Sequence, residues 1–145
     1  MWSRTPPVRD ACSMATLDHA HSLLRLAQRD CDALVGMQAS ALFADAIFGF
    51  HAQQAVEKAL KAWLTVRGRS YPFTLDLAGL LMRLQDAAAD VERFWPLERF
   101  SVYGILARYE EGDPDADEPL DRPAIVAEVA ALLTHVSTVL DEAGD

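Results

Sequence analysis

The chain has 145 residues, a length that suits one domain with a hydrophobic core of ordinary size. Its 22 acidic and 13 basic residues give a net charge of −9, which argues against a general nucleic-acid binder with a basic surface. Two cysteines do not form a disulfide framework, and no apolar run approaches the roughly eighteen residues needed to span a bilayer. We therefore expect a cytoplasmic protein with no membrane contact.

The negative charge is concentrated in one segment. Residues 110–121 contain seven acids and no base. Without them, fifteen acids (22 − 7) face thirteen bases, a net charge of −2, so the remaining surface leaves room for a local basic groove. Gly112, Pro114 and Pro119 give the segment the composition of a loop.

The chain divides into a short extension and one domain. We expect residues 1–14 to form a flexible N-terminal extension and residues 15–145 to form a single helical domain. The first eleven residues lack the apolar stretch of a secretory signal, and either Met1 or Met14 fits as the start.

Hydrophobic periodicity predicts helices throughout, with no strand alternation. The first helix has Thr16 as N-cap and ends at Gly36, and the central helix stops at Gly68. The expected helices, in chain order, are residues 16–35, residues 39–67, a third capped by Thr74, a short fourth from Trp95-Pro96 towards Arg108, and a last one from Asp121 and Pro123. The predicted fold class is an all-α antiparallel bundle of four to five helices.

The histidines show no pattern of metal ligands. His19 and His21 lie on different faces of the first helix, without a cysteine or carboxylate partner at ligand spacing. His135 lies within an apolar helix and is interpreted as a structural residue. The sequence therefore predicts neither a metal site nor a cofactor.

The central helix changes character halfway along. Its first half is apolar on all sides, which predicts burial, with Leu42, Phe43, Ile47, Phe48 and Phe50. Its second half has an apolar face that includes Trp63 and, opposite it, a polar line formed by Gln54, Lys58 and Lys61, with Gln53 and Glu57 beside them. This line is either a solvated face or part of a site. Lys58 and Lys61 are the only lysines in the chain, which slightly favours a site.

Three motifs resemble those of the HEPN domain, a small helical domain of prokaryotes and higher eukaryotes. The run from Phe50 to Ala62, FHAQQAVEKALKA, looks like its signature helix. Members usually follow this helix with Pro-x-Thr-His-Asp-Leu, to which residues 72–77, PFTLDL, are similar. They carry an arginine near the end of the next helix, and Arg108-Tyr109 falls in that place. The resemblance covers about Leu17 to Leu140 and implies the HEPN fold.

The resemblance implies one kind of catalytic chemistry, the cleavage of RNA. Several HEPN families are metal-independent ribonucleases with an Arg-x(4–6)-His motif contributed twice across a dimer. In this chain the three positions at that spacing from Arg108 are Asp113, Pro114 and Asp115, and Leu75 replaces the histidine of the turn. His51 and Arg108 are then the remaining candidates for catalysis, and we expect little or no RNA cleavage.

Two interpretations of the polar residues stay open. In the first, Lys58 and Arg108 form an anion or nucleotide site, with Gln53 and Gln54 donating amide hydrogen bonds. In the second, Glu57 and Arg108 neutralise each other between helices as part of a partly buried network.

The resemblance also implies partners. The first hypothesis is a nucleotide- or RNA-binding module paired with a small nucleotidyltransferase, as in a toxin–antitoxin pair. The alternatives are a metal-independent ribonuclease toxin with a divergent site and a non-catalytic dimerisation scaffold. We expect a homodimer, because HEPN proteins commonly pair with their arginine motifs facing each other, and because the apolar half of the central helix and Phe94, Trp95 and Phe100 supply hydrophobic surface.

Overall fold

The computed structural model describes residues 13–71, 73, 76–104 and 119–144. The helices in order are α1 (Met14–Met37), α2 (Asp45–Val66), α3 (Leu77–Asp86), the 3-10 helix η2 (Glu92–Phe100) and α5 (Arg122–Ala143). Residues 101–104 are also helical, and none of the described residues forms a strand. The predicted all-α bundle is confirmed.

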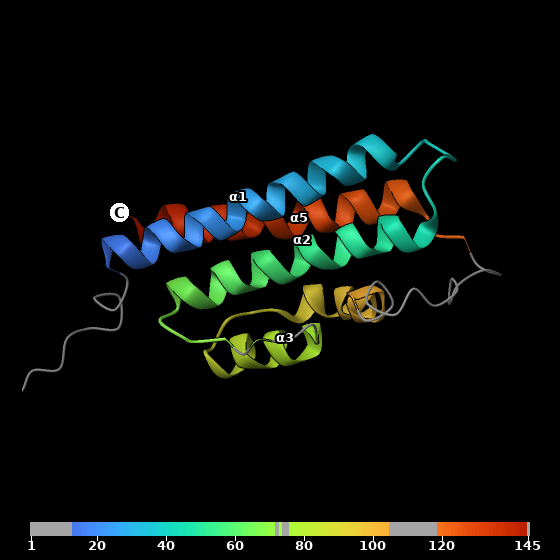
Figure 1. Ribbon diagram of the computed structural model, residues 1–145. Coiled ribbons are helices and arrows are strands. Elements are labelled where there is room, and N and C mark those ends of the chain that lie inside the picture. The colour runs from blue at the N-terminus through green and yellow to red at the C-terminus, as the bar shows by residue number, and fades with distance from the viewer. Residues whose placement is uncertain (1–12, 72, 74–75, 105–118, 145) are drawn as a thin grey trace, which may run out of the picture.

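The three long helices pack together, and α3 and η2 cover the other side of α2 (Figure 1). α1 runs antiparallel to α2, as the short connection between them predicts. α2 and α5 run in the same direction (Figure 1). Their starts lie side by side, where Arg122 of α5 pairs with Asp45 of α2. Further along both helices, Trp63 contacts His135.

Side chains at the helix starts define three of the boundaries. Asp121 accepts a hydrogen bond from the Ala124 amide at 3.2 Å, so the predicted start of the last helix is confirmed. The N-cap of α1 is Ser13, whose hydroxyl accepts from the Thr16 amide, and not Thr16 itself. α3 begins after Asp76, which is its N-cap in place of the predicted Thr74.

The central helix begins at Asp45, later than the predicted residue 39. The reason is Arg122, whose guanidinium donates to the carbonyls of Met37, Ser40 and Phe43 at 2.6–3.1 Å. These hydrogen bonds hold residues 38–44 in a non-helical connection. α1 itself continues through Gly36 to Met37.

The apolar first half of the predicted central helix is only partly buried, contrary to expectation. Phe48 is fully buried, whereas Leu42 is 85% exposed, Ile47 48% and Phe43 39%. Two aromatic residues of η2 were expected to supply surface and are buried instead. Phe94 and Phe100 are in the core, so they do not add to a surface for dimerisation.

The fourth helix is also different from the prediction. Residues 92–100 form a 3-10 helix with Pro96 inside it, so Trp95-Pro96 does not mark its start. Pro96 has no N–H to donate, and the tighter helix places Phe94, Leu97 and Phe100 against the core.

α5 is long and apolar enough to cross a membrane by length and composition alone, which we had not expected from the sequence. Its apolar side chains pack against α1 and α2 in the bundle. Only 33% of its most apolar window is buried in the bundle, so this packing accounts for part of its composition.

His135 belongs to an aromatic cluster in which side chains of α2, η2 and α5 meet. Its ring lies 4.8 Å from that of Trp63 and 5.4 Å from that of Phe94, measured between centroids, and its Nδ1 is 3.1 Å from Arg93. Burial lowers the pKa of His135, with a further contribution from the Arg93 charge. The geometry fits the predicted structural role.

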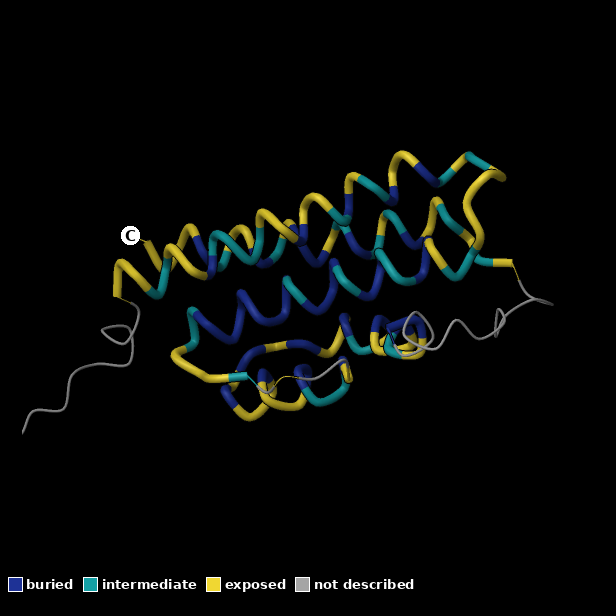
Figure 2. The backbone as a smooth tube through the Cα atoms, in the orientation of Figure 1, coloured by how far each residue is buried: buried dark blue, intermediate teal, exposed yellow. Residues whose placement is uncertain are grey.

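α2 is buried along most of its length (Figure 2). We predict that Trp63→Ala lowers the free energy of unfolding by about 3–5 kcal/mol, as other large-to-small changes in a core do. Trp63 is 1% exposed, and its removal would leave a cavity facing Phe94 and His135. Urea denaturation followed by circular dichroism measures the change. A loss below about 1 kcal/mol would show that the site collapses around the smaller side chain.

Candidate functional site

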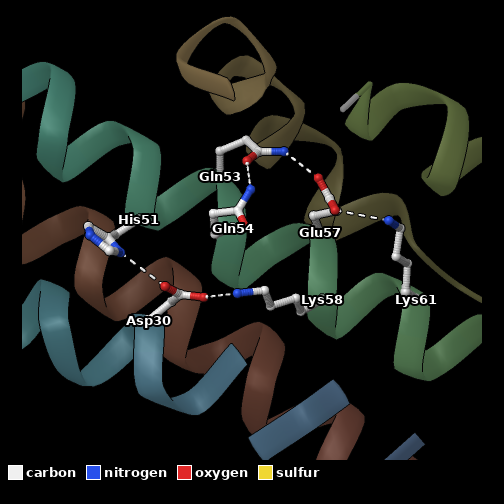
Figure 3. Close-up of polar contacts among 7 residues, drawn as sticks. All are labelled: Asp30, His51, Gln53, Gln54, Glu57, Lys58 and Lys61. Carbon is white, nitrogen blue, oxygen red and sulfur yellow. Dashed lines mark hydrogen bonds and ion pairs between the residues drawn. The ribbon is translucent and has the colours of Figure 1, made fainter. Parts of the chain in front are cut away.

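A chain of polar side chains follows one side of α2. The Gln54 amide donates to Gln53 at 2.7 Å, and Gln53 donates to Glu57 at 2.8 Å. Lys61 donates to the other oxygen of Glu57 at 2.9 Å (Figure 3). We call these four residues the buried polar chain. The predicted polar line is therefore only partly solvated, because Lys61 is buried together with Gln53 and Glu57 beside the line, whereas Gln54 and Lys58 are partly exposed.

Close backbone contact explains why this part of α2 is covered. The ring of Tyr103 lies on Gly49, where any Cβ would overlap it. Gln53 lies one turn after Gly49 on α2, and a Cβ on Gly104 would come within 3.1 Å of its side chain. The two glycines thus let residues 101–104 lie directly on α2, and the described part of this helix ends beside Gln53.

The other end of the buried polar chain is closed by Tyr71. The Lys61 ammonium lies 5.1 Å from the centroid of the Tyr71 ring, and the Tyr71 hydroxyl is 3.0 Å from His19 on α1. Lys61 therefore pairs with a carboxylate and an aromatic face within the protein, which is what a buried ammonium requires.

A second group of polar residues joins α1 to α2. One oxygen of Asp30 lies 2.9 Å from Nδ1 of His51, and the other accepts from Lys58 at 2.7 Å. We call these three residues the Asp30 cluster. The Asp30 side chain is 12% exposed, whereas those of His51 and Lys58 are 32% and 25% exposed. The two outer groups are open to solvent, and the carboxylate lies beneath them.

The open part of α2 is a narrow strip. Between residues 47 and 65, the residues of α2 that are not buried are Ile47, Phe50, His51, Gln54 and Lys58. We call these five residues the exposed strip. It begins with apolar and aromatic side chains and ends with an imidazole, an amide and an ammonium group. The Phe50 and His51 rings contact each other edge to face at 5.5 Å between centroids.

Only some of the predicted site residues lie in the described part of the chain. Gln53, Gln54 and Glu57 are joined in one network, while Lys58 is held on the α1 side by Asp30. Arg108, Asp113, Pro114, Asp115 and Leu75 lie outside the described residues. Glu57 is bound by Gln53 and Lys61, so its predicted pairing with Arg108 stays a prediction.

Asp30 was missed in the sequence. It is one of several acids on the first helix, and its charge alone does not mark it as a site residue. Its position does give one, because Ala27 and Leu34 of the buried stripe lie three residues before it and four after it. A carboxylate at the edge of a buried stripe faces the neighbouring helix, where Lys58 is the matching cation.

The chemistry available is hydrogen bonding and charge pairing. No group of three or more metal-ligating side chains occurs within the part of the chain that the structure describes. Lys58 and His51 can offer N–H groups to an oxyanion, and Gln54 can offer an amide. An aromatic face next to such donors is an arrangement suited to a nucleotide.

By its fold and its site, the protein is a helical bundle whose central helix carries internally paired polar residues. The HEPN domain family model matches residues 20–138, so the chain belongs to the HEPN family, which confirms the resemblance. A search of curated proteins found no match, and neither did a search of solved structures. Membership of this family supports a module concerned with nucleotides or RNA.

The buried ion pair can be tested separately from any function. We predict that Lys61→Met lowers the free energy of unfolding by about 3 kcal/mol, because it leaves the Glu57 carboxylate buried without its cation. The double variant Glu57→Gln/Lys61→Met should regain at least half of that loss, since the amide oxygen that replaces the carboxylate can still accept from Gln53. Denaturant titration of the single and double variants measures both. Losses that simply add would show that the two side chains are not coupled.

Proposed function

We propose that this HEPN protein binds nucleotides or RNA on the exposed strip of α2, without turning them over. The observation that supports this most directly is the order of groups along the strip. Phe50 offers an aromatic surface for a base. His51 beside it, Gln54 one turn further on and Lys58 two turns further on offer donors to sugar and phosphate oxygens. The rest of this stretch of α2 is buried, so a ligand of the helix has one surface to use.

Arg108 is proposed as the second phosphate contact. It follows Gly104 by four residues, and four residues of extended chain span at most about 14 Å. Gly104 itself lies against Gln53, next to Gln54 of the exposed strip. The chain length therefore allows the Arg108 guanidinium to reach a ligand there, where its planar fork would bind two phosphate oxygens.

Catalysis is not part of this proposal. A ribonuclease of this kind needs a histidine near its arginine, and the matching positions hold Asp113, Pro114 and Asp115. The remaining histidine of the site, His51, contacts Asp30 through Nδ1. Acids beside a phosphodiester would also oppose the charge that develops during cleavage.

The binding prediction is tested with a short fluorescent single-stranded RNA and with ATP, in metal-free buffer. We expect Arg108→Ala and Lys58→Met each to weaken binding by about tenfold or more, as the loss of a charge-assisted hydrogen bond would. Arg25→Ala is the matched control, because Arg25 is an exposed arginine on α1 that bonds only to Ser22 among the described residues.

The same samples test turnover. Gel analysis after long incubation should show intact RNA with wild type and variants alike. Cleavage that disappears in both Arg108→Ala and His51→Ala, with both variants folded, would contradict the proposal and favour the ribonuclease. Binding that none of the variants changes would place the ligand elsewhere.

We further propose that the protein acts as a homodimer in the cytoplasm, alongside a nucleotidyltransferase partner. The support for a dimer is the apolar surface formed by Leu42, Phe43 and Ile47, which adjoins the exposed strip. Arg122 fixes the connection that carries the first two, so little freedom is lost when they are covered. The nucleotidyltransferase follows from the family resemblance alone, and co-purification with the product of a neighbouring gene tests it.

Light scattering at micromolar concentration should give the mass of a dimer, whose interface would bury about 800 Å² per partner. Phe43→Glu should give a monomer, because it places a charge in the centre of this surface. Met82→Glu is the control, since Met82 is an equally apolar side chain, 58% exposed, on α3. A monomeric wild type, or a dimer that survives Phe43→Glu, would exclude this surface as the interface.

A further inference from the structure

We infer that Asp30 sets the ligand preference of the exposed strip, so that the site selects phosphodiesters with one charge per phosphate over polyphosphates. This inference rests on the proposed function and adds to it a residue from a different helix and a class of ligand. Its starting point is the geometry of the Asp30 cluster, in which one carboxylate occupies the place between two donors where an external oxyanion would bind.

The carboxylate is held as a bound anion would be. Its two oxygens lie 2.7 Å from the Lys58 ammonium and 2.9 Å from His51 Nδ1. It lies deeper than either donor, at 12% exposure against 25% and 32%. Asp30 on α1 reaches across to both donors on α2 (Figure 3), so we take the carboxylate to stay in place when a ligand binds. A ligand must therefore bind over the carboxylate and share the two donors with it.

The charges of the site cancel before any ligand arrives. Lys58 is balanced by Asp30, and Lys61 is balanced by Glu57. A ligand at the exposed strip is then bound by directional hydrogen bonds and stacking, while the Asp30 charge repels each negative charge that it brings. The repulsion grows with each negative charge that the ligand brings.

Two opposite effects of Asp30 on binding have to be compared. As a positioning group, it holds Lys58 and His51 in place, which contributes about fivefold at most, as for a partly exposed ion pair. As a charge about 6 Å from a ligand phosphate, with an effective dielectric constant of about 40, it weakens binding by roughly tenfold for each ligand charge at that distance. Repulsion therefore outweighs positioning for a ligand that brings one negative charge to that distance, and by more for each further charge.

The experiment uses Asp30→Asn, which keeps the shape of the side chain and an acceptor oxygen for Lys58 but removes the charge. Asp32→Asn is the matched control, because Asp32 is an exposed residue of the same helix that accepts from Gln28 at 3.0 Å and makes no hydrogen bond to the cluster among the described residues. Calorimetric titrations at neutral pH and low salt measure three probes. They are adenosine without a phosphate, the dinucleotide ApA with one phosphodiester, and ATP.

The expected result is a graded gain of affinity. Wild type should bind ApA more tightly than ATP. Asp30→Asn should weaken adenosine by no more than the roughly fivefold positioning effect, strengthen ApA by up to about tenfold, and strengthen ATP by more than ApA. The gains should shrink as salt is added, because charges near the surface are screened. Asp32→Asn should bind all three as wild type does.

Several outcomes would overturn the inference. Equal gains in Asp30→Asn and Asp32→Asn would show a general effect of net charge, and weaker binding of every probe by Asp30→Asn would show a positioning role only. A wild type that prefers ATP to ApA would contradict the ligand class. If wild type binds ApA through Lys58 and Arg108 while Asp30→Asn changes nothing, the proposed function stands and this inference fails. If neither wild type nor Asp30→Asn binds any probe, the proposed function fails and takes the inference with it.

Discussion

The burial of α2 on nearly all sides is the constraint on which the rest of the structure depends. α1 and α5 cover one side of this helix, and α3, η2 and residues 101–104 cover the other. A helix in that position cannot leave its polar side chains to water, so each must find a partner within the protein. Glu57 and Lys61 do so along α2 itself, and Lys58 does so across to Asp30 on α1. The same packing leaves only the exposed strip open.

Most of the fold could be predicted because its signals are local. The leucines of α3 and the stripe of α5 recur at helical spacing, and Asp121 followed by Pro123 marks a helix start within four residues. The start of α2 could not be predicted in this way. It depends on Arg122, which binds carbonyls 79 to 85 residues away in the sequence. Within residues 39–44 only a local bond from the Leu42 amide to the Ser40 hydroxyl competes with a helix, so the folded chain is needed to show where the helix begins.

The candidate site was predicted in its residue types but not in its environment. Helical spacing places Gln54, Lys58 and Lys61 on one line with Gln53 and Glu57 beside it, and the structure joins four of these residues while Lys58 pairs with Asp30. Spacing does not show which element covers that line, and here residues 101–104 and Tyr71 cover it. Asp30 belongs to a helix that carries several acids, and its pairing with Lys58 joins residues 28 positions apart. The identity of the partner is a property of how the helices pack.

The use of lysine on α2 and arginine elsewhere follows from what each side chain must bind. Lys61 reaches one oxygen of Glu57 within the same helix, and Lys58 reaches one oxygen of Asp30, so a compact ammonium on a flexible stem is sufficient for both. Arg122 must bind three carbonyls and a carboxylate in one connection, which requires the several N–H groups of a planar guanidinium. The presence of both lysines on α2 is thus explained by internal pairing. In the absence of any ligand, neither Lys58 nor Lys61 contributes a net charge to the site. Selectivity among anions therefore has to come from the Asp30 carboxylate beneath the exposed strip and from side chains of other segments.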